Sequence, residues 1–220
     1  MKFGMTAEAY LFDYPFPDGF DPMNKRYEPT EIMKFGELVH RKEGDAFVQN
    51  FLYYLVLNKL GYYSAANNFT ISMTDIGTIG VPGGTSRSVP NMQYSFRMAY
   101  DLGSSQNWGT VVGTGNAAVT IADIKLQTQI ANGSGANQLV HGVQQYSAGP
   151  YTSGSSRYII LGRSFTNISG GNITVNEMGI YAYYASGPWY FCFARDLVAG
   201  GVTINDGKVG YFQYKWQITV

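Results

Sequence analysis

Among the residues that could do chemistry in this sequence, an acidic and a basic side chain on two predicted strands stand out. Glu177 lies within an apolar run over 173–184, and Arg163 lies within a second run over 158–166. A hairpin centred on Gly170 would place Arg163 directly opposite Glu177. We expect a cross-strand ion pair with a structural role, since a paired-carboxylate hydrolase would need a second acid beside Glu177.

Histidine, cysteine and a second charged pair are the next candidates. His40 and His141 are far apart in the sequence, and neither has the spacing of a zinc site. Cys192 is the only cysteine, so it can form neither an intrachain disulfide nor a cysteine-based metal site. Arg195 and Asp196 follow an aromatic run, and this pattern favours a salt bridge at the end of a strand over a catalytic pair.

Two further motifs resemble ligand sites without matching them. Gly113-Thr114-Gly115 is not followed by the Gly-Lys-Ser/Thr of a phosphate-binding loop. The carboxylates of Asp13, Asp18 and Asp21 miss the spacing of a calcium-binding loop. The sequence therefore predicts a protein that is not an enzyme and that needs no metal or cofactor.

The composition limits the partners. Fifteen basic and fifteen acidic residues balance, and charged residues make up only 14% of the chain. Nucleic-acid binding by phosphate neutralisation needs clustered Lys and Arg, so this balance argues against it. The longest apolar stretch is too short to span a bilayer, and the N-terminus lacks the pattern of a secretory signal. Low charge with many Gly and Tyr residues is typical of β-structured surface or assembly proteins.

The elements that must position these residues are clearest over 157–220, which predicts three or four antiparallel strands. Asp206-Gly207 between two β-rich runs indicates a hairpin turn. In the last strand, polar and apolar residues alternate, so one face is expected to form the core and the other to be exposed or at an interface. The predicted core residues are Phe212, Tyr214, Trp216, Ile218 and Val220, and the predicted outer residues are Gln213, Lys215 and Gln217.

The N-terminal segment, 1–36, shows no steady period and predicts an extended arm. Its prolines exclude a helix or a central strand over 12–22, yet aromatic residues there require burial. Docking on its own domain and docking on a neighbouring subunit are both open, and we hypothesise that the arm crosses to another subunit. The candidate interface residues are Tyr14, Phe16 and Phe20.

A helix is predicted over 45–60. Asp45 suits the N-cap, Gly61 suits the C-terminal cap, and apolar residues recur at four-residue steps between them. A polar, glycine-rich segment over 144–156 predicts a long exposed loop. Tyr146 and Tyr151 make it a candidate recognition loop, because tyrosine gives contact area at low entropic cost.

Together these elements predict a mainly β protein. We expect an antiparallel β-sandwich, jelly-roll-like, with one N-terminal α-helix and an extended N-terminal arm. The arm occupies 1–36, and a single sandwich domain that includes the helix occupies 37–220.

Several segments in order resemble a group of structural proteins from tailed bacteriophages. The likeness spans about three quarters of the chain and rests on the series rather than on one motif. The segments are Gly44–Leu52, Gly113–Leu126, Ile130–Gly133, Arg163–Gly171 with Ile173–Tyr181, Ala194–Leu197 and Val202–Val220.

The resemblance implies a virion component, associated with capsid, neck, tail or fibre, that acts through interfaces between subunits. It implies a β-sandwich without catalytic residues that assembles with copies of itself and with other virion proteins. The alternative is a carbohydrate-binding or adhesin module that recognises a host surface glycan. Tyr146, Tyr151, Tyr158 and Trp189 would then be the candidates for stacking on a sugar ring.

Overall fold

The fold is taken from a computed structural model of the chain. The residues that it describes are 2–14, 16, 20–23, 25, 27–44, 70–77, 84–90, 96–98, 105–147, 149–185, 187 and 189–219. The helix predicted over 45–60 lies outside these residues.

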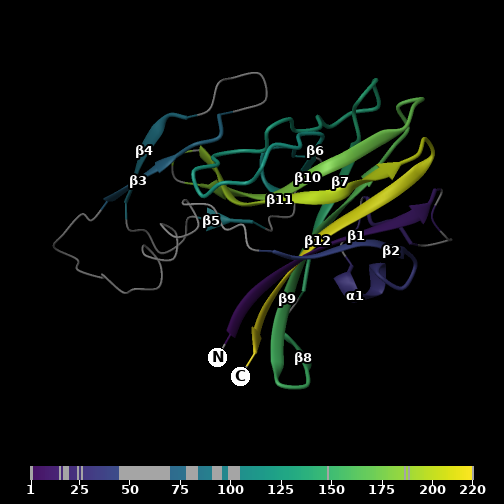
Figure 1. Cartoon of the computed structure of the whole chain (residues 1–220), viewed down its shortest axis with the longest axis horizontal. Helices are drawn as coiled ribbons and strands as arrows, with labels where there is room; N and C mark the ends of the chain where they lie inside the picture. Colours follow the sequence, from purple (N-terminus) through teal and green to yellow (C-terminus); the bar gives the residue numbers. More distant parts are fainter. Residues whose placement is uncertain are drawn as a thin grey trace.

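The described chain is mainly antiparallel β, as predicted, and its larger sheet contains both ends of the described sequence (Figure 1). This large sheet has the strand order β2-β1-β12-β9-β7, and β8 pairs with β9. The strands are β1 (Lys2–Asp13), β2 (Glu37–Gly44), β7 (Val140–Tyr146), β8 (Tyr151–Ser153), β9 (Ser156–Thr166) and β12 (Lys208–Thr219).

A small sheet packs against the large one. Its order is β11-β10-β5, and β6 also pairs with β10. A separate two-stranded sheet joins β3 to β4. The strands are β10 (Ile173–Tyr184), β11 (Trp189–Ile204), β5 (Phe96–Arg97), β6 (Gly109–Gly113), β3 (Thr70–Thr74) and β4 (Ser86–Pro90).

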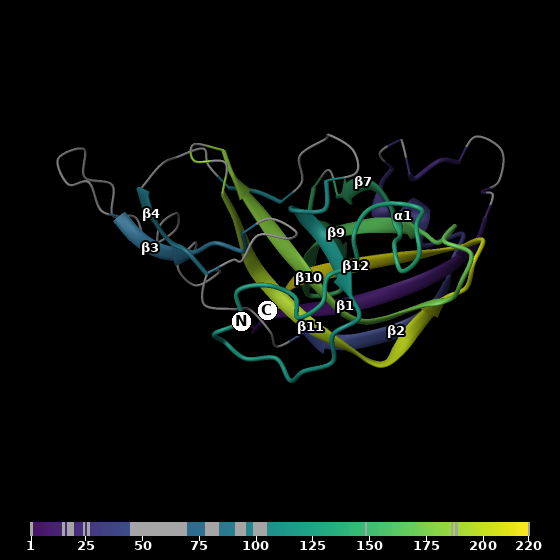
Figure 2. The same cartoon turned by 90° about the horizontal axis from the view of Figure 1, so that it is seen from above.

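The main core lies between the large and small sheets, which form the sandwich-like arrangement seen in Figures 1 and 2. Alternation along the strands supplies it, because every second side chain points to the same face. The large sheet contributes Met5, Ala7, Ala9, Phe165, Phe212 and Tyr214, and the small sheet contributes Val175, Ile180, Phe191, Phe193, Val202 and Ile204.

Two short connections cross from one sheet to the other, which corrects the predicted hairpins. The turn after β9 leads to β10, and the turn at Asp206-Gly207 leads from β11 to β12. In both cases the first and second strands belong to different sheets. Glycine still permits the reversal, since Gly170 and Gly207 have φ of 82° and 75°. We call these two connections the arches.

Asn167 holds the two arches together and is fully buried. Its side-chain amide donates to the carbonyl oxygens of Gly171 and Ile204, both at 2.7 Å. Its backbone N–H donates to the carbonyl of Lys208 at 2.9 Å, and its carbonyl accepts from the N–H of Gly207 at 2.8 Å. One asparagine therefore satisfies backbone groups of both arches.

The N-terminal segment, expected over 1–36 as an extended arm that docks on its own domain or on a neighbouring subunit, begins with a strand inside its own chain's large sheet. Strand β1 lies between β2 and β12, with Lys2 opposite Thr219 and Asp13 opposite Lys208. Its alternating apolar side chains Met5, Ala7 and Ala9 enter the main core. The hypothesis that this segment crosses to another subunit therefore fails for residues 2–13.

Residues after β1 cover the outer face of the large sheet. Helix α1 (Pro29–Ile32) is a single turn, begun by a capping box between Glu28 and Glu31. It lies below β1 and β2 in Figure 1. A second cluster is buried there, composed of Tyr10, Phe12, Ile32, Val209 and Tyr211, with Phe16, Phe20, Tyr27 and Met33 packed against it.

The burial of side chains on the two faces of β12 differs in part from the prediction. Phe212 and Tyr214 are fully buried in the main core, as predicted. Trp216 is only half-buried, and Ile218 is 44% exposed, because the strand continues past the small sheet. Gln213 was expected outside but is fully buried, since its amide donates to Glu8 Oε2 at 2.7 Å beneath the N-terminal cover.

Candidate functional site

A β-bulge turns Glu177 away from the main core. The register between β10 and β11 shifts between Val175 and Glu177, so the strand changes phase. Val175 points to the main core before the bulge, and Met178 points there after it. Glu177 therefore faces the opposite side of the small sheet, together with Tyr181.

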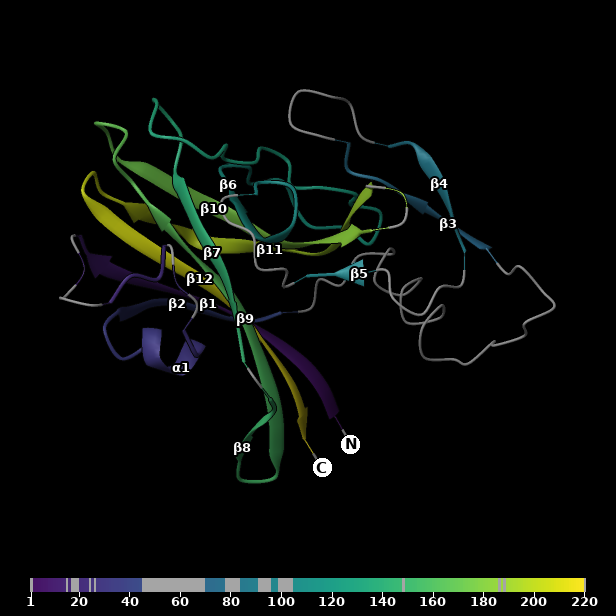
Figure 3. The ribbon, with the colours of Figure 1, turned by 180° about the vertical axis from the view of Figure 1, so that it is seen from behind.

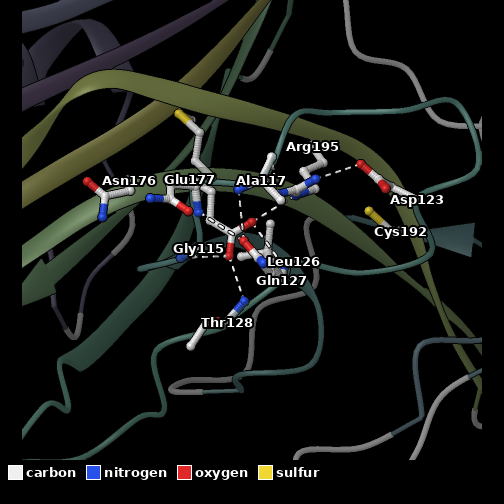
Figure 4. Close-up of polar contacts among 12 residues, drawn as sticks. Gly115, Ala117, Asp123, Leu126, Gln127, Thr128, Asn176, Glu177, Cys192 and Arg195 are labelled. Carbon is white, nitrogen blue, oxygen red and sulfur yellow. Dashed lines mark hydrogen bonds and ion pairs between the residues drawn. The ribbon is translucent and has the colours of Figure 1, made fainter.

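Backbone groups of the segment 113–130 surround the Glu177 carboxylate (Figure 4). Oε1 accepts from the N–H of Thr128 at 2.7 Å and from that of Gly115 at 3.2 Å. Oε2 accepts from the N–H of Gln127 at 3.0 Å and from Arg195 Nε at 2.8 Å. A buried carboxylate with both oxygens in such contacts fixes the segment above it.

The glycines of the Gly-x-Gly motif have a packing role here. A β-carbon at Gly113 would lie 2.6 Å from Glu177 Oε1, and one at Gly115 would lie 2.5 Å from the same atom. Both positions therefore require glycine, because any side chain would displace the carboxylate. The motif brings backbone close to a carboxylate, not to a phosphate.

Arg195 extends this network to the tip of the segment. Its Nη1 donates to Asp123 Oδ2 at 2.7 Å, and its Nη2 donates to the carbonyl of Ala117 at 2.9 Å. Burial opposes the charge of Arg195, but the bonds to Glu177 and Asp123 outweigh this and raise its pKa. Burial likewise acts to raise the pKa of Asp123, yet bonds from Thr120 and Arg195 lower it.

The predicted pairing of Arg163 with Glu177 is wrong, because their strands lie in different sheets. Arg163 is opposite Phe212 on β12, and Glu177 is opposite Leu197 on β11. Arg195, not Arg163, forms the ion pair with Glu177. The adjacent Asp196 is paired across the sheets with Lys42 of β2 at 3.7 Å rather than with Arg195.

Arg163 is a fully buried cation, and no ion pair joins it to a carboxylate in the described part of the chain. Its Nη1 donates to the carbonyl of Ser105 at 2.7 Å, and its guanidinium lies 5.5 Å from the centre of the Trp108 ring. Among the residues that the structure describes, none accepts a hydrogen bond from Nε or Nη2. Burial lowers the pKa of Arg163 to about 9.

His141 lies in the same interior region. It is 3% exposed, and its ring packs edge-on against Phe165 at 4.9 Å. Burial lowers its pKa to about 3, the nearby charge of Arg163 acts in the same direction, and a backbone contact to Ile130 opposes both. His40 is also shifted, since burial and then the charge of Lys42 lower its pKa.

The candidate recognition loop over 144–156 is largely strand. Tyr146 ends β7, and Tyr151 begins β8. The Tyr151 hydroxyl bonds to Glu28, and its ring lies 5.4 Å from that of Tyr158. Tyr146 instead lines a shallow pocket of about 370 Å³ on the inner face of the large sheet.

The candidate interface residues come together on the outer side of the large sheet. Tyr14 and Phe16 have ring centres 5.8 Å apart, and Phe16 and Phe20 are 5.5 Å apart. The sequence did not single out Phe35, which lies 4.4 Å from Phe20. We call Tyr14, Phe16, Phe20 and Phe35 the aromatic ridge. Tyr14 is 46% exposed and Phe35 is 51% exposed.

Among the described residues, no three His, Cys, Asp or Glu side chains are grouped to hold a metal. Within the same residues, no helix has the length and apolar character to span a bilayer. Comparison with protein families, with curated proteins and with solved structures finds no match to this chain.

Proposed function

We propose that this protein is a structural subunit of a tailed-phage virion, which assembles with copies of itself and with other virion proteins. The aromatic ridge is the observation that carries the proposal. The order of segments that resembles phage structural proteins supplies the virion context.

The ridge has the properties of an interface rather than of a core. Its four rings contact one another in series, yet Tyr14 and Phe35 remain about half exposed. Contiguous exposed aromatic surface is costly for an isolated protein and is enriched at interfaces between proteins. Phe16 and Phe20 pack on the buried cluster beneath, so the ridge is held rigidly before any partner binds.

The buried charges support a structural role. Glu177, Arg195 and Asp123 hold one loop in place, and Lys42 with Asp196 connects the two sheets. Each of these groups is occupied in fixing the fold. Such a scaffold keeps its surfaces in fixed positions, as a repeating assembly requires.

The test combines light scattering with electron microscopy. The double variant Tyr14→Ser/Phe35→Ser removes the exposed rings, and Ile121→Ser/Ile168→Ser is the matched control. The control residues are similarly exposed, at 61% and 46%, but are outside the ridge. We expect wild type and control to form one closed oligomer and the ridge variant to be monomeric.

Two results would contradict the proposal at different levels. A wild-type chain that stays monomeric at every accessible concentration would exclude assembly through the ridge. The virion context is tested separately by mass spectrometry of density-purified particles that package the gene. Absence of the chain from such particles would exclude that context even if the protein self-assembles.

Glycan binding has less support, because most aromatic residues expected to stack on sugars contact other rings. Tyr151 lies against Tyr158, and Trp189 is stacked on Tyr184 at 5.6 Å with an interplanar angle of 10°. Binding of a glycan by the monomer on an array would nonetheless favour the adhesin class over a structural subunit.

A further inference from the structure

A short segment between β1 and α1 lies against β7. We call its described residues, 20–23, 25, 27 and 28, the strap. In the strand order β2-β1-β12-β9-β7, the strap follows β1 and reaches β7 at the other end of the order. Figure 3 shows this purple trace beside β7, between the end of β1 and α1.

One buried side chain of β7 holds the strap by its backbone. The amide nitrogen of Gln145 donates to the carbonyl oxygens of Pro22 and Lys25, at 3.2 and 2.8 Å. The amide oxygen of Gln145 accepts from the N–H of Tyr27 at 2.6 Å. All three bonds are made to main-chain atoms, and Gln145 itself is fully buried.

The neighbouring residues of the site bring the strap close to the sheet. The N–H of Val143 donates to the carbonyl of Met23 at 3.0 Å. A β-carbon at Gly142 would lie 3.0 Å from Cα of Met23, so glycine allows this close approach. At the end of the strap, the carboxylate of Glu28 accepts a hydrogen bond from the hydroxyl of Tyr151 on β8.

The exposed part of the aromatic ridge is too small to hold two copies together by itself. Tyr14 and Phe35 are about half exposed, and Phe16 and Phe20 are less exposed. An aromatic side chain buries about 150–250 Å² in full, so two ridges in contact would bury roughly 700 Å² in all. A stable interface buries about 1,200 Å² or more. The closed oligomer proposed above therefore needs further contact between its copies.

We propose that neighbouring copies exchange their straps, so that the strap of one copy occupies the Gln145 site of the next. This inference rests on the proposed self-assembly through the ridge. Phe20 belongs to both the ridge and the strap, so the ridge contact brings the straps of two copies side by side. Exchange keeps every hydrogen bond of the strap, because the exchanged element is identical. It also turns the buried face of the strap into a contact between copies, which supplies the missing area.

The strands on either side of the strap stay in their own sheet. β1 and β2 pair with each other there, and β1 also pairs with β12. Only the connection between β1 and β2 crosses to the neighbour. The exchange is therefore compatible with the position of residues 2–13 inside the large sheet.

The test links the strap chemically to its site. Glu28→Cys/Tyr151→Cys places one cysteine on the strap and one on β8, at side chains that are in contact. The purified full chain is treated with a short bis-maleimide and analysed on a denaturing gel. Wild type is the blank, because its only cysteine, Cys192, is fully buried. Glu28→Cys/Ile121→Cys is the matched control, with its second cysteine at an exposed residue of another loop.

We expect covalent dimers and larger multimers from Glu28→Cys/Tyr151→Cys and none above background from the control. Adding Tyr14→Ser/Phe35→Ser should replace them by a link within one chain, because a strap without a neighbour docks on its own β7.

Gln145→Met tests the site itself. It removes three hydrogen bonds and should lower the yield of linked multimers roughly tenfold or more. Gln217→Met is its control at a glutamine of β12 and should leave the yield unchanged. An equal yield from both variants would show that Gln145 does not hold the strap.

Light scattering on the same samples separates a failure of the exchange from a failure of the proposed function. A closed oligomer that gives only links within one chain would overturn the exchange and leave assembly through the ridge intact. A monomeric chain with links of that kind would overturn both. Folded variants that give no link of either kind would show that the strap does not lie on this site, which also overturns the exchange.

Discussion

At the scale of single residues, Glu177 and Arg163 have opposite electrostatic environments. Glu177 is buried with an ion pair and three backbone donors, whereas Arg163 is buried with one carbonyl and one aromatic ring. Sequence spacing alone suggested that the two compensate each other. Their actual neighbours come from other segments of the chain. Glu177 is paired with Arg195, and Arg163 contacts Ser105 and Trp108.

Replacing Glu177 by Gln should reduce the free energy of unfolding by about 3–5 kcal/mol, because it leaves Arg195 buried without this partner. Urea denaturation measures the change. Glu37→Gln is the matched control at an exposed acid and should change stability by less than about 0.5 kcal/mol.

A double-mutant cycle separates the two possible pairings of Glu177. Combining Glu177→Gln with Arg195→Met should give a coupling of about 1–3 kcal/mol. Combining it with Arg163→Met should give a coupling near zero. The reverse pattern would mean that the hairpin register predicted from the sequence is right and this arrangement is wrong.

The lowered pKa of His141 predicts a loss of stability in acid. Its pKa is about 3 in the folded chain against 6.5 in the unfolded chain, so the unfolded state binds more protons between these values. Stability should therefore fall as pH falls from about 6 to 3, by roughly 1.4 kcal/mol per unit. Denaturant unfolding at pH 7 and pH 4.5 measures the slope.

Carboxylates also titrate over this range, so the slope needs a comparison. His141→Leu should make the pH dependence flatter, whereas His40→Leu should change it less, since His40 is less deeply buried. Equal slopes for wild type and His141→Leu would show that His141 does not charge on unfolding.

At the scale of elements, the strands could be predicted from sequence but their partners could not. The segment 173–184 has the predicted bounds, and Phe212 with Tyr214 faces the core as alternation requires. Alternation and turn residues are local signals. Whether a turn returns a strand to its own sheet or carries it to the opposite one depends on tertiary packing, as the arches show.

For the candidate site, too, local sequence signals did not predict which residues come together. The bulge beside Val175 reverses which face Glu177 occupies, and no residue type in the sequence marks it. Phe35 became notable only from its exposure in the folded chain, whereas Trp216, predicted for the core, is only half-buried there. Gly113 and Gly115 did stand out, but the carboxylate that requires them is more than sixty residues away in the sequence.

Asn167 should be the most sensitive residue of the arches. Asn167→Ala removes two buried amide donors and leaves the carbonyls of Gly171 and Ile204 without them, which should cost about 2–3 kcal/mol of unfolding free energy. Asn205→Ala is the control in the neighbouring arch, where the side chain is exposed. Thermal and urea denaturation measure both; equal effects would exclude a linking role for Asn167.

At the scale of the whole molecule, β1 determines whether the large sheet can form. It is bonded to β2 on one edge and to β12 on the other. Its alternate residues Met5, Ala7 and Ala9 enter the main core. The N-terminal segment is thus an interior part of the fold, although its prolines after residue 13 suggested an independent arm.

Deleting residues 1–13 should therefore prevent folding rather than only assembly. Circular dichroism and ¹H–¹⁵N NMR spectra of the truncated chain should show loss of the β signal and of dispersed peaks. The Tyr14→Ser/Phe35→Ser variant is the control, because it alters the surface and keeps β1. A truncated chain with well-dispersed spectra would show that β1 is dispensable.

The pairing of β1 with β12 also sets the order in which the chain can fold during synthesis. Lys2 lies opposite Thr219, so β1 is synthesised long before β12, the strand that pairs with one of its edges. Contacts of such long sequence separation slow folding and leave strand edges open meanwhile. Nascent chains stalled before residue 208 should thus remain sensitive to protease, and resistance should appear only once β12 has left the ribosome.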